Sequence, residues 1–475
     1  MNVLLISPPM QVHVAPSFPS FGVFYVAQAM KTKGHNVQIV DIDGNRYPKK
    51  EVSEIIKKSD CDIIAIGGLV SIYPYLAWLV PEIKRLKPNI EIVLGGAIAS
   101  SLGKRCFDRF DVDYIVIGEG EITIVELLEE IKTTRNFSSV KGIGYRNGNG
   151  GVQFTEPRPL RDSLDDLPIF DDSLFPMENY LKQGTIQIHA QRGCPCSCTF
   201  CFNCFRVVSS KVRYRPVKDT VDEIEYFKNK YGDRISLFAI SGESITMNKQ
   251  WVIDFCKEIL HRKLKIAYRV TSRVNSMDEE RLKWLKKSGC IRVIFGLESG
   301  SQKILKIMKK AATVKQGLKA VRLTKKYIRE IEASIIFGYI GEDRQTLTDT
   351  VRFCKEIKVR PTICYATPFP GTELYQMAVE KSRIKDEEKY MMGMATASAF
   401  DFDPSLNLTD MSDDEAREQM TLAFREIALY YFLRSPWQSF KMVSSNLKTV
   451  GVKNTASKIW SWVSNLKRKP VLVNN

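Results

Sequence analysis

Five of the eleven cysteines of this 475-residue chain lie close together, in the stretch QRGCPCSCTFCFNC at residues 191–204. Cys194, Cys198 and Cys201 form a C-x3-C-x2-C pattern in a loop that also contains Gly and Pro. A zinc site usually has four ligands in two separated pairs, and no second pair follows here. Three thiolates instead suit an iron–sulfur cluster in which one iron lacks a protein ligand. Such an iron can bind a small molecule through an amine and a carboxylate.

Two further thiols lie in the same stretch. Cys196 falls inside the three-cysteine pattern, and Cys204 lies just beyond it. We interpret both as non-ligands, but the spacing leaves an exchange of Cys204 for Cys201 open. The plainer alternative is a group of core cysteines or a zinc ion bound by chance. It is disfavoured because free core cysteines do not usually crowd a loop that contains Gly and Pro.

Composition narrows the class of protein. An apolar fraction of 44% is ordinary for a globular chain and allows large buried cores. The sequence contains no run of about 18 apolar residues, so it does not predict a membrane span. The opening MNVLLISPPM lacks the basic start and the small-residue cleavage site of a signal peptide. We therefore expect a cytoplasmic protein, in which clustered thiols stay reduced and bind metal.

Residues 1–145 alternate between short runs rich in Val and Ile and amphipathic segments. The runs, each bounded by Gly, Asp or Pro, are residues 2–7, 36–42, 62–69, 90–96 and 113–120. Alternating strands and helices predict an α/β domain with a doubly wound parallel sheet. In such a sheet the ligand lies outside the carboxyl ends of the strands, which are rich in Gly here.

The rest of the chain predicts three more regions. Residues 146–185, dense in Gly, Pro and Asp, indicate a linker. Residues 186–383 alternate again, with six expected strands at 185–191, 235–241, 265–272, 291–299, 330–340 and 361–369. They predict a partial (β/α)6 barrel of the TIM type, with its chemistry at the carboxyl ends of the strands. Residues 384–475 are expected to be mostly helical.

The stretch RGCPCSCTFC resembles the signature of the radical S-adenosylmethionine (SAM) enzymes. The resemblance implies that Cys194, Cys198 and Cys201 hold a 4Fe-4S cluster and that SAM chelates the fourth iron. In that family, one-electron reduction cleaves SAM to a 5′-deoxyadenosyl radical. The position of Cys196 is often aromatic in the family. No catalytic residue beyond the cluster is assigned.

Further short matches follow in the order of the family, each at the end of an expected strand. ISGES, with Ser241 in place of the first Gly, resembles the Gly-Gly-Glu element that holds the SAM amino group. A carboxylate beside an ammonium makes physical sense. IFGYIGE, with Gly341 and Glu342, resembles the strand-five region, and ATPFPGTELY resembles the closure near the adenine. The implied SAM contacts are Gly242, Glu243, Arg273, Glu298, Ser299, Gly338 and Pro368.

A doubly wound domain ahead of such a barrel resembles the cobalamin-dependent radical SAM subfamily, with methyltransferases of class B among its members. The opening residues 4–41, the GG pairs and GEGE carry this resemblance. A flat corrin and its nucleotide tail need close approach of the backbone, which glycine permits. The resemblance implies a Rossmann-like cobalamin-binding domain over residues 1–145. The implied cobalamin contacts are Gly68, Gly95, Gly96, Gly118 and Glu119.

Two histidines and two cysteines of this region bear on its ligand. The Asp-x-His-x-x-Gly loop that ligates cobalt in many other cobalamin proteins is absent. His13, in the loop after the first strand, and His35, expected at the surface in a turn, leave the axial ligation of cobalt open. Relatives that modify tRNA carry three cysteines in their front domain, whereas only Cys61 and Cys106 are present here. GGAIAS is not G-x-G-x-x-G, so NAD is poorly supported, and a Rossmann unit without cofactor is the alternative.

The end of the chain is strongly basic and contributes to a formal net charge of +16. After Glu426 there is no acidic residue, whereas eight basic ones follow, namely Arg434, Lys441, Lys448, Lys453, Lys458, Lys467, Arg468 and Lys469. The same stretch contains Trp437, Phe440, Trp460, Trp462 and Leu466. Trp together with Lys suits the interface of a membrane with anionic lipid. A helix packed on the barrel, with a solvated basic face, is the alternative.

Together these patterns predict a cobalamin-binding radical SAM enzyme that methylates an unactivated carbon. The resemblance implies that the adenosyl radical abstracts hydrogen and that methylcobalamin delivers the methyl group. We expect a small hydrophobic or natural-product substrate, such as a lipid or tetrapyrrole, and an electron donor such as ferredoxin or flavodoxin. Peripheral membrane contact through the tail is expected, and nucleic acid is not. The alternatives are oxidation, cyclisation or rearrangement without methyl transfer, RNA modification, or a non-catalytic metal-binding or RNA-binding protein.

Overall fold

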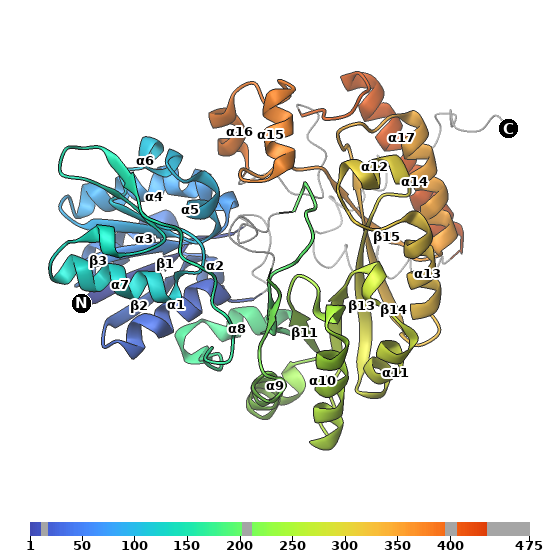
Figure 1. Ribbon diagram of the computed structural model, residues 1–475, viewed down its shortest axis with the longest axis horizontal. Coiled ribbons are helices and arrows are strands. Elements are labelled where there is room, and N and C mark those ends of the chain that lie inside the picture. The colour runs from blue at the N-terminus through green and yellow to red at the C-terminus, as the bar shows by residue number, and fades with distance from the viewer. Residues whose placement is uncertain (11–17, 202–210, 395–405, 435–475) are drawn as a thin grey trace.

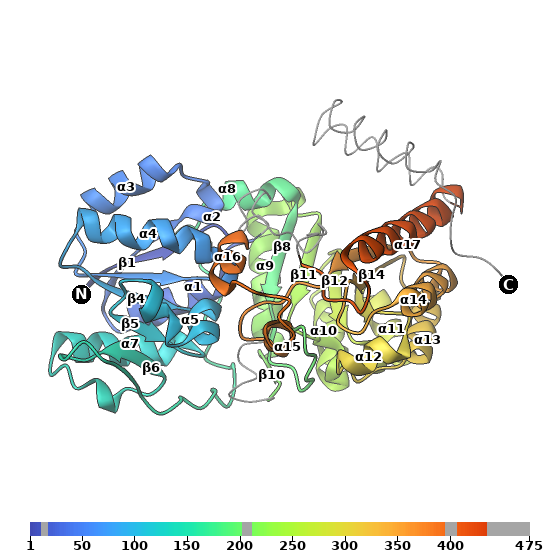
Figure 2. The ribbon, with the colours of Figure 1, turned by 90° about the horizontal axis from the view of Figure 1, so that it is seen from above.

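The structure is a computed structural model that describes residues 1–10, 18–201, 211–394 and 406–434. Two α/β units lie beside each other, and each is built around its own sheet (Figure 1). The helix α17 lies at the end of the molecule opposite the first sheet, in both views (Figures 1 and 2). None of the described helices has the length and apolar character needed to cross a membrane.

The first unit contains a seven-stranded sheet of order β2-β1-β3-β4-β5-β6-β7. Five parallel strands are followed by two antiparallel ones, with bounds β1 Asn2–Ser7, β2 Asn36–Asp41, β3 Ile63–Gly67, β4 Glu91–Gly95, β5 Tyr114–Val116, β6 Ile143–Arg146 and β7 Val152–Phe154. The helices are α1 Phe21–Thr32, α2 Ile42–Asn45, α3 Lys49–Lys58, α4 Tyr73–Leu86, α5 Ala97–Leu102, α6 Arg105–Arg109 and α7 Gly120–Lys132. The expected doubly wound α/β fold is confirmed.

Both faces of this sheet are buried, which explains why its strands are continuous apolar runs. Val3 and Leu5 of β1 face the core beneath α1 and α7, whereas Leu4 and Ile6 face the core beneath α3 and α4. Parallel sheets covered by helices on both faces have this composition. The strand order reverses between β1 and β3, and the carboxyl ends of strands beside such a point are where ligands bind.

The second unit is a six-stranded parallel sheet in sequential order, from β8 at one edge to β15 at the other. Its strands are β8 Thr185–His189, β11 Leu237–Ser241, β12 Tyr268–Ser272, β13 Cys290–Glu298, β14 Glu330–Phe337 and β15 Pro361–Tyr365. Its helices are α9 Val217–Tyr231, α10 Lys249–His261, α11 Glu279–Lys287, α12 Gln302–Ile307, α13 Val314–Thr324 and α14 Arg344–Ile357. The partial barrel is confirmed, and all six strands lie where the sequence predicted them.

Smaller elements connect and extend the two units. A two-stranded ribbon, β9 Gln191–Arg192 with β10 Arg213–Tyr214, carries the cysteine loop, and α8 Met177–Tyr180 precedes the barrel. The remaining helices are α15 Glu373–Glu380, α16 Glu387–Gly393 and α17 Asp413–Arg434. The tail with its tryptophans, His13 and Cys204 lie outside the described residues.

Part of the segment 146–185, expected to be a linker, contains regular structure. Its strand β7 pairs with β6 and extends the first sheet. A strand of three residues at a sheet edge is too short to produce a periodic pattern, so it could not be predicted from the local residues. The division of the chain into domains remains a prediction.

His35 was expected at the surface, and that expectation is wrong. The side chain is buried, with 6% of its surface exposed, and Nε2 lies 3.5 Å from the carboxylate of Glu129 on α7. Burial lowers the pKa of His35, so the ring is neutral at physiological pH. Helix α7 covers the turn before β2, and a turn covered in this way cannot be recognised from local sequence.

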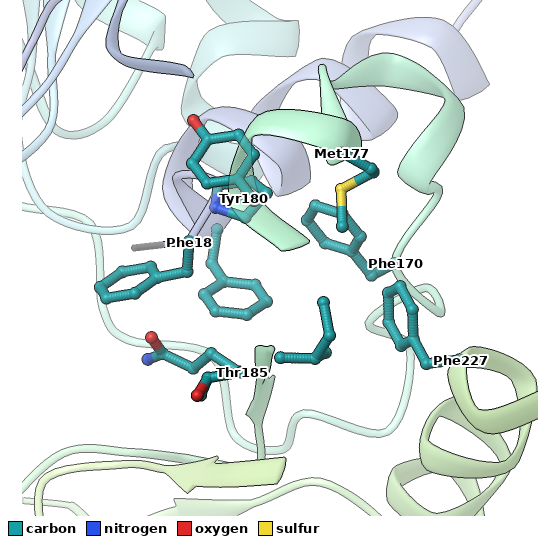
Figure 3. A pocket seen from close by; sticks show the side chains of 10 residues that line it. Phe18, Phe170, Met177, Tyr180, Thr185 and Phe227 are labelled. Carbon is teal, nitrogen blue, oxygen red and sulfur yellow. The ribbon is translucent and has the colours of Figure 1, made fainter. Parts of the chain in front are cut away.

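One apolar core runs through both units. It joins Phe24 of α1 to Phe170 and Tyr180 of the connecting segment and to Phe227 of α9. Figure 3 shows the pocket at this seam, which has a volume of about 10 Å³. That is room for a single water molecule, so the seam is a packed joint rather than a ligand site.

Candidate functional site

The cysteine loop leaves the end of β8 and has a closed base. Gln191 and Arg192 pair with Tyr214 and Arg213 in the β9–β10 ribbon. Gly193 follows with a φ of +92°, and a Cβ at this position would lie 2.2 Å from the carbonyl oxygen of Lys211. Only glycine fits both the backbone angle and the space. The loop that starts at Cys194 therefore leaves the ribbon in a fixed direction.

The thiols of the three-cysteine pattern are electrostatic neighbours. Cys198 is buried and Cys194 is half-buried, whereas solvent reaches Cys201. Burial by the surrounding protein, followed by the charges of Cys198 and Cys194, raises the pKa of the Cys201 thiol to about 12. Solvent reaches the Cys201 thiol although protein surrounds most of it, so this thiol lies in a recess. Metal coordination would deprotonate such thiols outright.

Among the described residues, no three His, Cys, Asp or Glu side chains are grouped to hold a single metal ion. A 4Fe-4S cluster makes a different demand, because each thiolate binds a different iron atom. The donor set of three recessed thiols fits such a cluster.

A buried glutamine ties the cysteine loop to the end of β11. Gln191, 1% exposed, donates a hydrogen bond to the Gly193 carbonyl and accepts one of 3.0 Å from the Ser244 amide. A Cβ on Gly242 would lie 2.4 Å from the Gln191 Oε1 atom, so glycine is required there. The predicted SAM contact Gly242 is thus packed directly against the base of the cysteine loop.

Glu243 follows Gly242 and also faces the cysteine loop. Burial raises the pKa of this carboxyl, while hydrogen bonds from its own amide and the Gly193 amide oppose the rise. The side chain is nevertheless exposed to solvent. Glu243, like Cys201, is therefore recessed but accessible, which is what a carboxylate that binds a cationic ligand requires.

Arg273, at the end of β12, brings a positive charge to the thiols. The side chain is 8% exposed, and its Nη1 atom lies 4.0 Å from the Cys198 sulfur. Its Nη2 atom donates to the carbonyls of Lys310 and Ala311. These carbonyls hold the guanidinium in place, so a positive charge is fixed beside the Cys198 sulfur. The position resembles that of a residue that tunes a metal ligand from outside its coordination sphere.

Glu298, at the end of β13, has a left-handed φ of +66°. Its buried carboxylate accepts a hydrogen bond of 2.6 Å from Lys310. A Cβ on Gly296 would lie 2.2 Å from the Glu298 Oε1 atom, so glycine makes room for this ion pair. The Lys310 ammonium also lies 5.8 Å from the ring centre of Phe200 in the cysteine loop. Glu298 is one of eight non-glycine residues with a positive φ in the described part of the chain.

The other three predicted SAM contacts form hydrogen bonds with other residues of the protein. The Ser299 hydroxyl lies 3.1 Å from that of Thr350 and accepts from the Ser301 amide. The Gly338 amide donates to Glu342, and the Pro368 carbonyl accepts from Tyr390. All three positions lie at or after carboxyl ends of strands. The structure brings Gly242, Glu243, Arg273 and Glu298 around the cysteine loop. Within the described part of that loop, residues 193–201, it records no contact with Ser299, Gly338 or Pro368.

The predicted cobalamin contacts form a second group, at the carboxyl ends of β3, β4 and β5. Gly95 ends β4, and Gly96 has a φ of +82°; a Cβ on Gly96 would lie 2.8 Å from the carbonyl oxygen of Gly68. The Gly118 amide donates a 3.0 Å hydrogen bond to Ser100. The strand ends are therefore tied together by the close approach of Gly96 to the Gly68 carbonyl and by the hydrogen bond from the Gly118 amide to the Ser100 side chain. This is an edge on which a large flat ligand can lie close to the main chain.

Glu119 differs from these glycines because its carboxylate points to the barrel. It is buried and pairs with Arg213 at 2.9 Å and with Arg192 at 3.1 Å. Arg192 also pairs with Glu121 at 2.6 Å. Burial alone would raise the pKa of Glu119, but the two arginines outweigh it and lower that pKa. This ion-pair network fixes the end of β5 to the base of the cysteine loop.

A second connection between the units comes from the segment after the barrel. A Cβ on Gly371 would lie 2.8 Å from the Ser101 side chain of α5. Glu388 on α16 accepts from Tyr73 at 2.6 Å and pairs with Arg109 at 2.6 Å. Both views place α16 between the two units (Figures 1 and 2). The apolar core of the first unit extends to this segment through Phe369, Met391 and Met394.

Several of these site residues were missed by sequence reasoning. Gln191 and Arg192 immediately precede the cysteine pattern, so their position was a usable signal. Lys310 and Arg213 carried no such signal. The helix α12 separates Lys310 from its partner Glu298, and Arg213 lies 94 residues after its partner Glu119. Only the fold brings these charges together.

Comparison with known proteins agrees with this arrangement. The sequence model of the radical SAM superfamily matches residues 188–354, and that of the B12 binding domain matches residues 10–128. An uncharacterized methyltransferase of Pyrococcus horikoshii is 29% identical over 443 residues, which are 91% of this chain and 93% of that protein. An anaerobic magnesium-protoporphyrin IX monomethyl ester cyclase of Rubrivivax gelatinosus is 29% identical over 411 residues, covering 82% of this chain and 72% of that protein.

A solved structure shares the fold of the whole chain. It is a cobalamin-dependent S-adenosylmethionine radical enzyme, OxsB, with aqua-cobalamin and S-adenosylmethionine bound. The TM-score is 0.72 at 17% identity, covering 100% of this chain and 76% of that chain. The two family matches fall on the two units described above and confirm the resemblance seen in the sequence. The chain is therefore a cobalamin-binding radical SAM enzyme, with a B12-binding domain ahead of a radical SAM domain and with a 4Fe-4S cluster, SAM and cobalamin as its cofactors.

Proposed function

We propose that this enzyme methylates an unactivated carbon of a hydrophobic or natural-product substrate, such as a lipid or a tetrapyrrole. When bound, the cluster with SAM supplies a carbon-centred radical chemistry and cobalamin supplies the methyl group. The observation that carries the proposal is the Glu119 network with Arg192 and Arg213. It holds the glycine edge of the first unit against the base of the cysteine loop, which supports a proposal in which cobalamin and the cluster are bound next to each other.

On this proposal, Cys194, Cys198 and Cys201 hold the cluster, and Cys196 and Cys204 do not. The Arg273 guanidinium, 4.0 Å from the Cys198 sulfur, stabilises the ligated thiolate. Of all the thiols in the described part of the loop, the one at Cys198 is the most deeply buried. We therefore treat it as the ligand whose loss is most informative.

The same proposal gives the barrel carboxylates different roles. Glu243, recessed and accessible, binds the ammonium group of SAM, with Gly242 leaving room for the base of the loop. Glu298 and Lys310 form an ion pair with no net charge, which keeps the Lys310 ammonium beside Phe200 and the thiols. Arg273, Ser299, Gly338 and Pro368 shape the strand ends around SAM.

For cobalamin, we propose that Gly68, Gly95, Gly96 and Gly118 let the corrin and its nucleotide tail approach the backbone. Glu119 acts as a positioning residue in this group, since its carboxylate is held by two arginines. The axial ligation of cobalt stays open. We further propose that residues 1–145 and 186–383 are the two catalytic domains, that 146–185 connects them, and that 384–475 is an accessory region.

The proposed setting is the cytoplasm, where thiols stay reduced, with ferredoxin or flavodoxin as electron donor. The substrate would enter at the junction between the two domains. A peripheral contact with a membrane would bring a lipid or tetrapyrrole within reach of that junction. Nucleic acid is not expected to be a substrate.

A second candidate reaction is a cyclisation, oxidation or rearrangement without methyl transfer. The 29% identity to the anaerobic magnesium-protoporphyrin IX monomethyl ester cyclase favours it, since that relative is named for ring formation. Both candidate reactions need the same three cofactors, and they differ in whether the methyl group of SAM is transferred to the product.

The test is turnover with SAM labelled in its methyl group. Enzyme reconstituted under anaerobic conditions is incubated with a reductant and with lipid or tetrapyrrole candidates, and products are followed by mass spectrometry. Methylation predicts label in the product together with 5′-deoxyadenosine. A product without label, formed with 5′-deoxyadenosine, would replace the proposal by the cyclase-like alternative. Absence of SAM cleavage under all conditions would contradict both.

A further inference from the structure

One stretch of the barrel is basic without interruption. Between Glu298 and Glu330 the sequence has ten Lys and Arg residues and no Asp or Glu. This stretch contains α12 and α13, and both views place α13 on the side of the barrel away from the first unit (Figures 1 and 2). An ordinary solvated helix surface mixes the two signs of charge, as α14 does with three basic and two acidic residues.

The outer face of α13 combines this charge with apolar side chains. The side that packs on the barrel is buried and consists of Gly317, Ala320, Val321 and Thr324. The opposite side, whose residues are three or four positions apart and so share one face, lines an open depression of about 430 Å³. The four cations of this face are exposed, and its two leucines are half-buried. We call its six residues the α13 groove: Lys315, Leu318, Lys319, Arg322, Leu323 and Lys326.

Neighbouring acidic residues neutralise only part of the charge of the α13 groove. Arg322 pairs with Glu356 of α14 at 2.6 Å, and Lys326 is close enough to Glu279 of α11 to lower the pKa of that carboxyl. The other two cations of the groove form no ion pair with any residue of the described ranges. A positive surface with apolar flanks is complementary to an acidic protein surface.

Nucleic acid is the other common acidic partner of a basic surface. Proteins that bind single strands combine a positive groove with aromatic side chains on which the bases stack. None of the six residues of the α13 groove is aromatic. The composition of the groove therefore favours an acidic protein over a nucleic acid.

The start of α13 is connected to the cysteine loop. The Met308 carbonyl accepts a hydrogen bond of 3.0 Å from the Thr199 amide, and the Lys310 ammonium lies 5.8 Å from the ring centre of Phe200. Helix α13 begins directly after this segment. The α13 groove therefore starts beside the loop that contains the thiols, on a part of the barrel where solvent reaches Cys201.

We infer that the α13 groove is the docking surface for an acidic one-electron carrier protein of the ferredoxin or flavodoxin class. The inference rests on the proposed function, because it names where the electron donor of that reaction binds. The reduced carrier gives one electron to the bound cluster and is itself left oxidised by one electron, and no bond forms or breaks in this step. Encounters between redox proteins bury little surface and are steered by charge, so the carrier can leave after the transfer.

The test uses the full-length enzyme loaded with cluster and cobalamin. Binding of flavodoxin, and separately of ferredoxin, is measured by isothermal titration calorimetry at several salt concentrations. We expect at least one carrier to bind, with an affinity that falls as salt is raised. The double substitution Lys315→Gln and Lys319→Gln should weaken this binding about tenfold and raise the KM for the carrier by the same factor in a 5′-deoxyadenosine assay. With dithionite as the reductant, variant and parent should cleave SAM at the same rate.

The matched control is Lys57→Gln with Lys58→Gln, which removes the same charge from the exposed end of α3 in the first unit. The control should bind the carrier as the parent does, and melting temperature and iron content are compared for all variants. Equal carrier affinities of the groove variant and the control would overturn the inference. So would a parent enzyme that binds neither carrier, or single-stranded RNA binding that the groove variant loses while it keeps its affinity for the carrier.

The two readouts separate this inference from the proposed function. Calorimetry measures docking without turnover, and dithionite drives SAM cleavage without a carrier. A parent that binds the carrier, loses this binding in the groove variant and yet does not cleave SAM with dithionite would support the docking surface and contradict the proposed function.

Discussion

The two cofactor edges of this enzyme are built from different materials. The edge of the first unit is rich in glycine, with Gly68, Gly96 and Gly118 following the ends of three strands. The edge of the barrel consists of charged side chains, with Glu243, Arg273 and the Glu298–Lys310 pair around the thiols. A large, flat ligand gains most from close approach, whereas a small, charged ligand gains most from directed charges. The comparison separates two kinds of residue. The glycines of the first edge are important because they have no side chain, and the residues of the barrel edge are important because of their charge.

The largest expected effect is on the barrel edge. Cys198→Ala should abolish bound 4Fe-4S cluster and 5′-deoxyadenosine formation, because a buried ligand is lost. Cobalamin should still bind, since the glycine edge is untouched. Iron content, the visible spectrum and SAM cleavage are the measurements. Cys196→Ala, in the same loop, is the control and should retain both iron and cleavage; loss of iron in both variants would break the assignment.

The next effect comes from the buried ion pair of the barrel. Lys310→Met leaves the carboxylate of Glu298 buried without its partner, which costs about 3–5 kcal/mol of stability in comparable cases. We expect a lower melting temperature and weaker SAM binding by spectroscopic titration. Adding Glu298→Gln should restore part of the stability. Lys309→Met removes an exposed pair with Glu373 and should cost under about 1 kcal/mol. Equal losses in the two Lys variants would refute the role of the pair.

A third effect is a pH dependence at the end of β14. Burial raises the pKa of Glu342 to about 8, although amides of Gly338 and Tyr339 donate to it. In the unfolded chain the pKa is near 4.5, so the folded state holds a proton that the unfolded state releases. This carboxyl therefore reduces stability as pH rises from 4.5 to 8, by up to about 1.4 kcal/mol per pH unit.

Glu342→Gln removes that penalty. The difference in melting temperature between the variant and the parent should be small at pH 5 and largest near pH 8. Thermal melts across this range provide the measurement. A constant difference at all pH values would mean that Glu342 is ionised in the folded state.

The smallest effect is expected at the glycine edge. Gly96→Ala places a Cβ 2.8 Å from the Gly68 carbonyl at a positive φ, with a cost of about 1–3 kcal/mol. Cobalamin loading should fall, while SAM cleavage stays. Gly103→Ala has a positive φ but open space around its Cβ, so it measures the backbone cost alone. If Gly103→Ala lowers cobalamin loading equally, the close-approach argument is wrong for this edge.

Local patterns in the sequence were enough for the parallel strands of both sheets and for the three-cysteine pattern. Val and Ile runs such as those of β1 and β3 are bounded by Gly, Asp or Pro, and each strand could be predicted from its own residues. The connections between the domains could not be predicted. Glu119 pairs with Arg213, and Gly371 packs on Ser101, across separations that no local pattern encodes. The prediction that His35 lies at the surface was wrong for the same reason, because the helix that covers this side chain, α7, is distant from it in sequence.

The contact of Gly371 with Ser101 has a mechanical consequence. The loop that contains Pro368 and Gly371 cannot move toward α5 without displacing the Ser101 side chain, because a Cβ on Gly371 would lie 2.8 Å from it. On the proposed assignment of sites, a shift of this loop toward α5 on SAM binding would therefore be transmitted to the helix beside the glycine edge. Reciprocity requires the same factor in both directions: whatever enhancement cobalamin gives to SAM affinity, SAM must return to cobalamin.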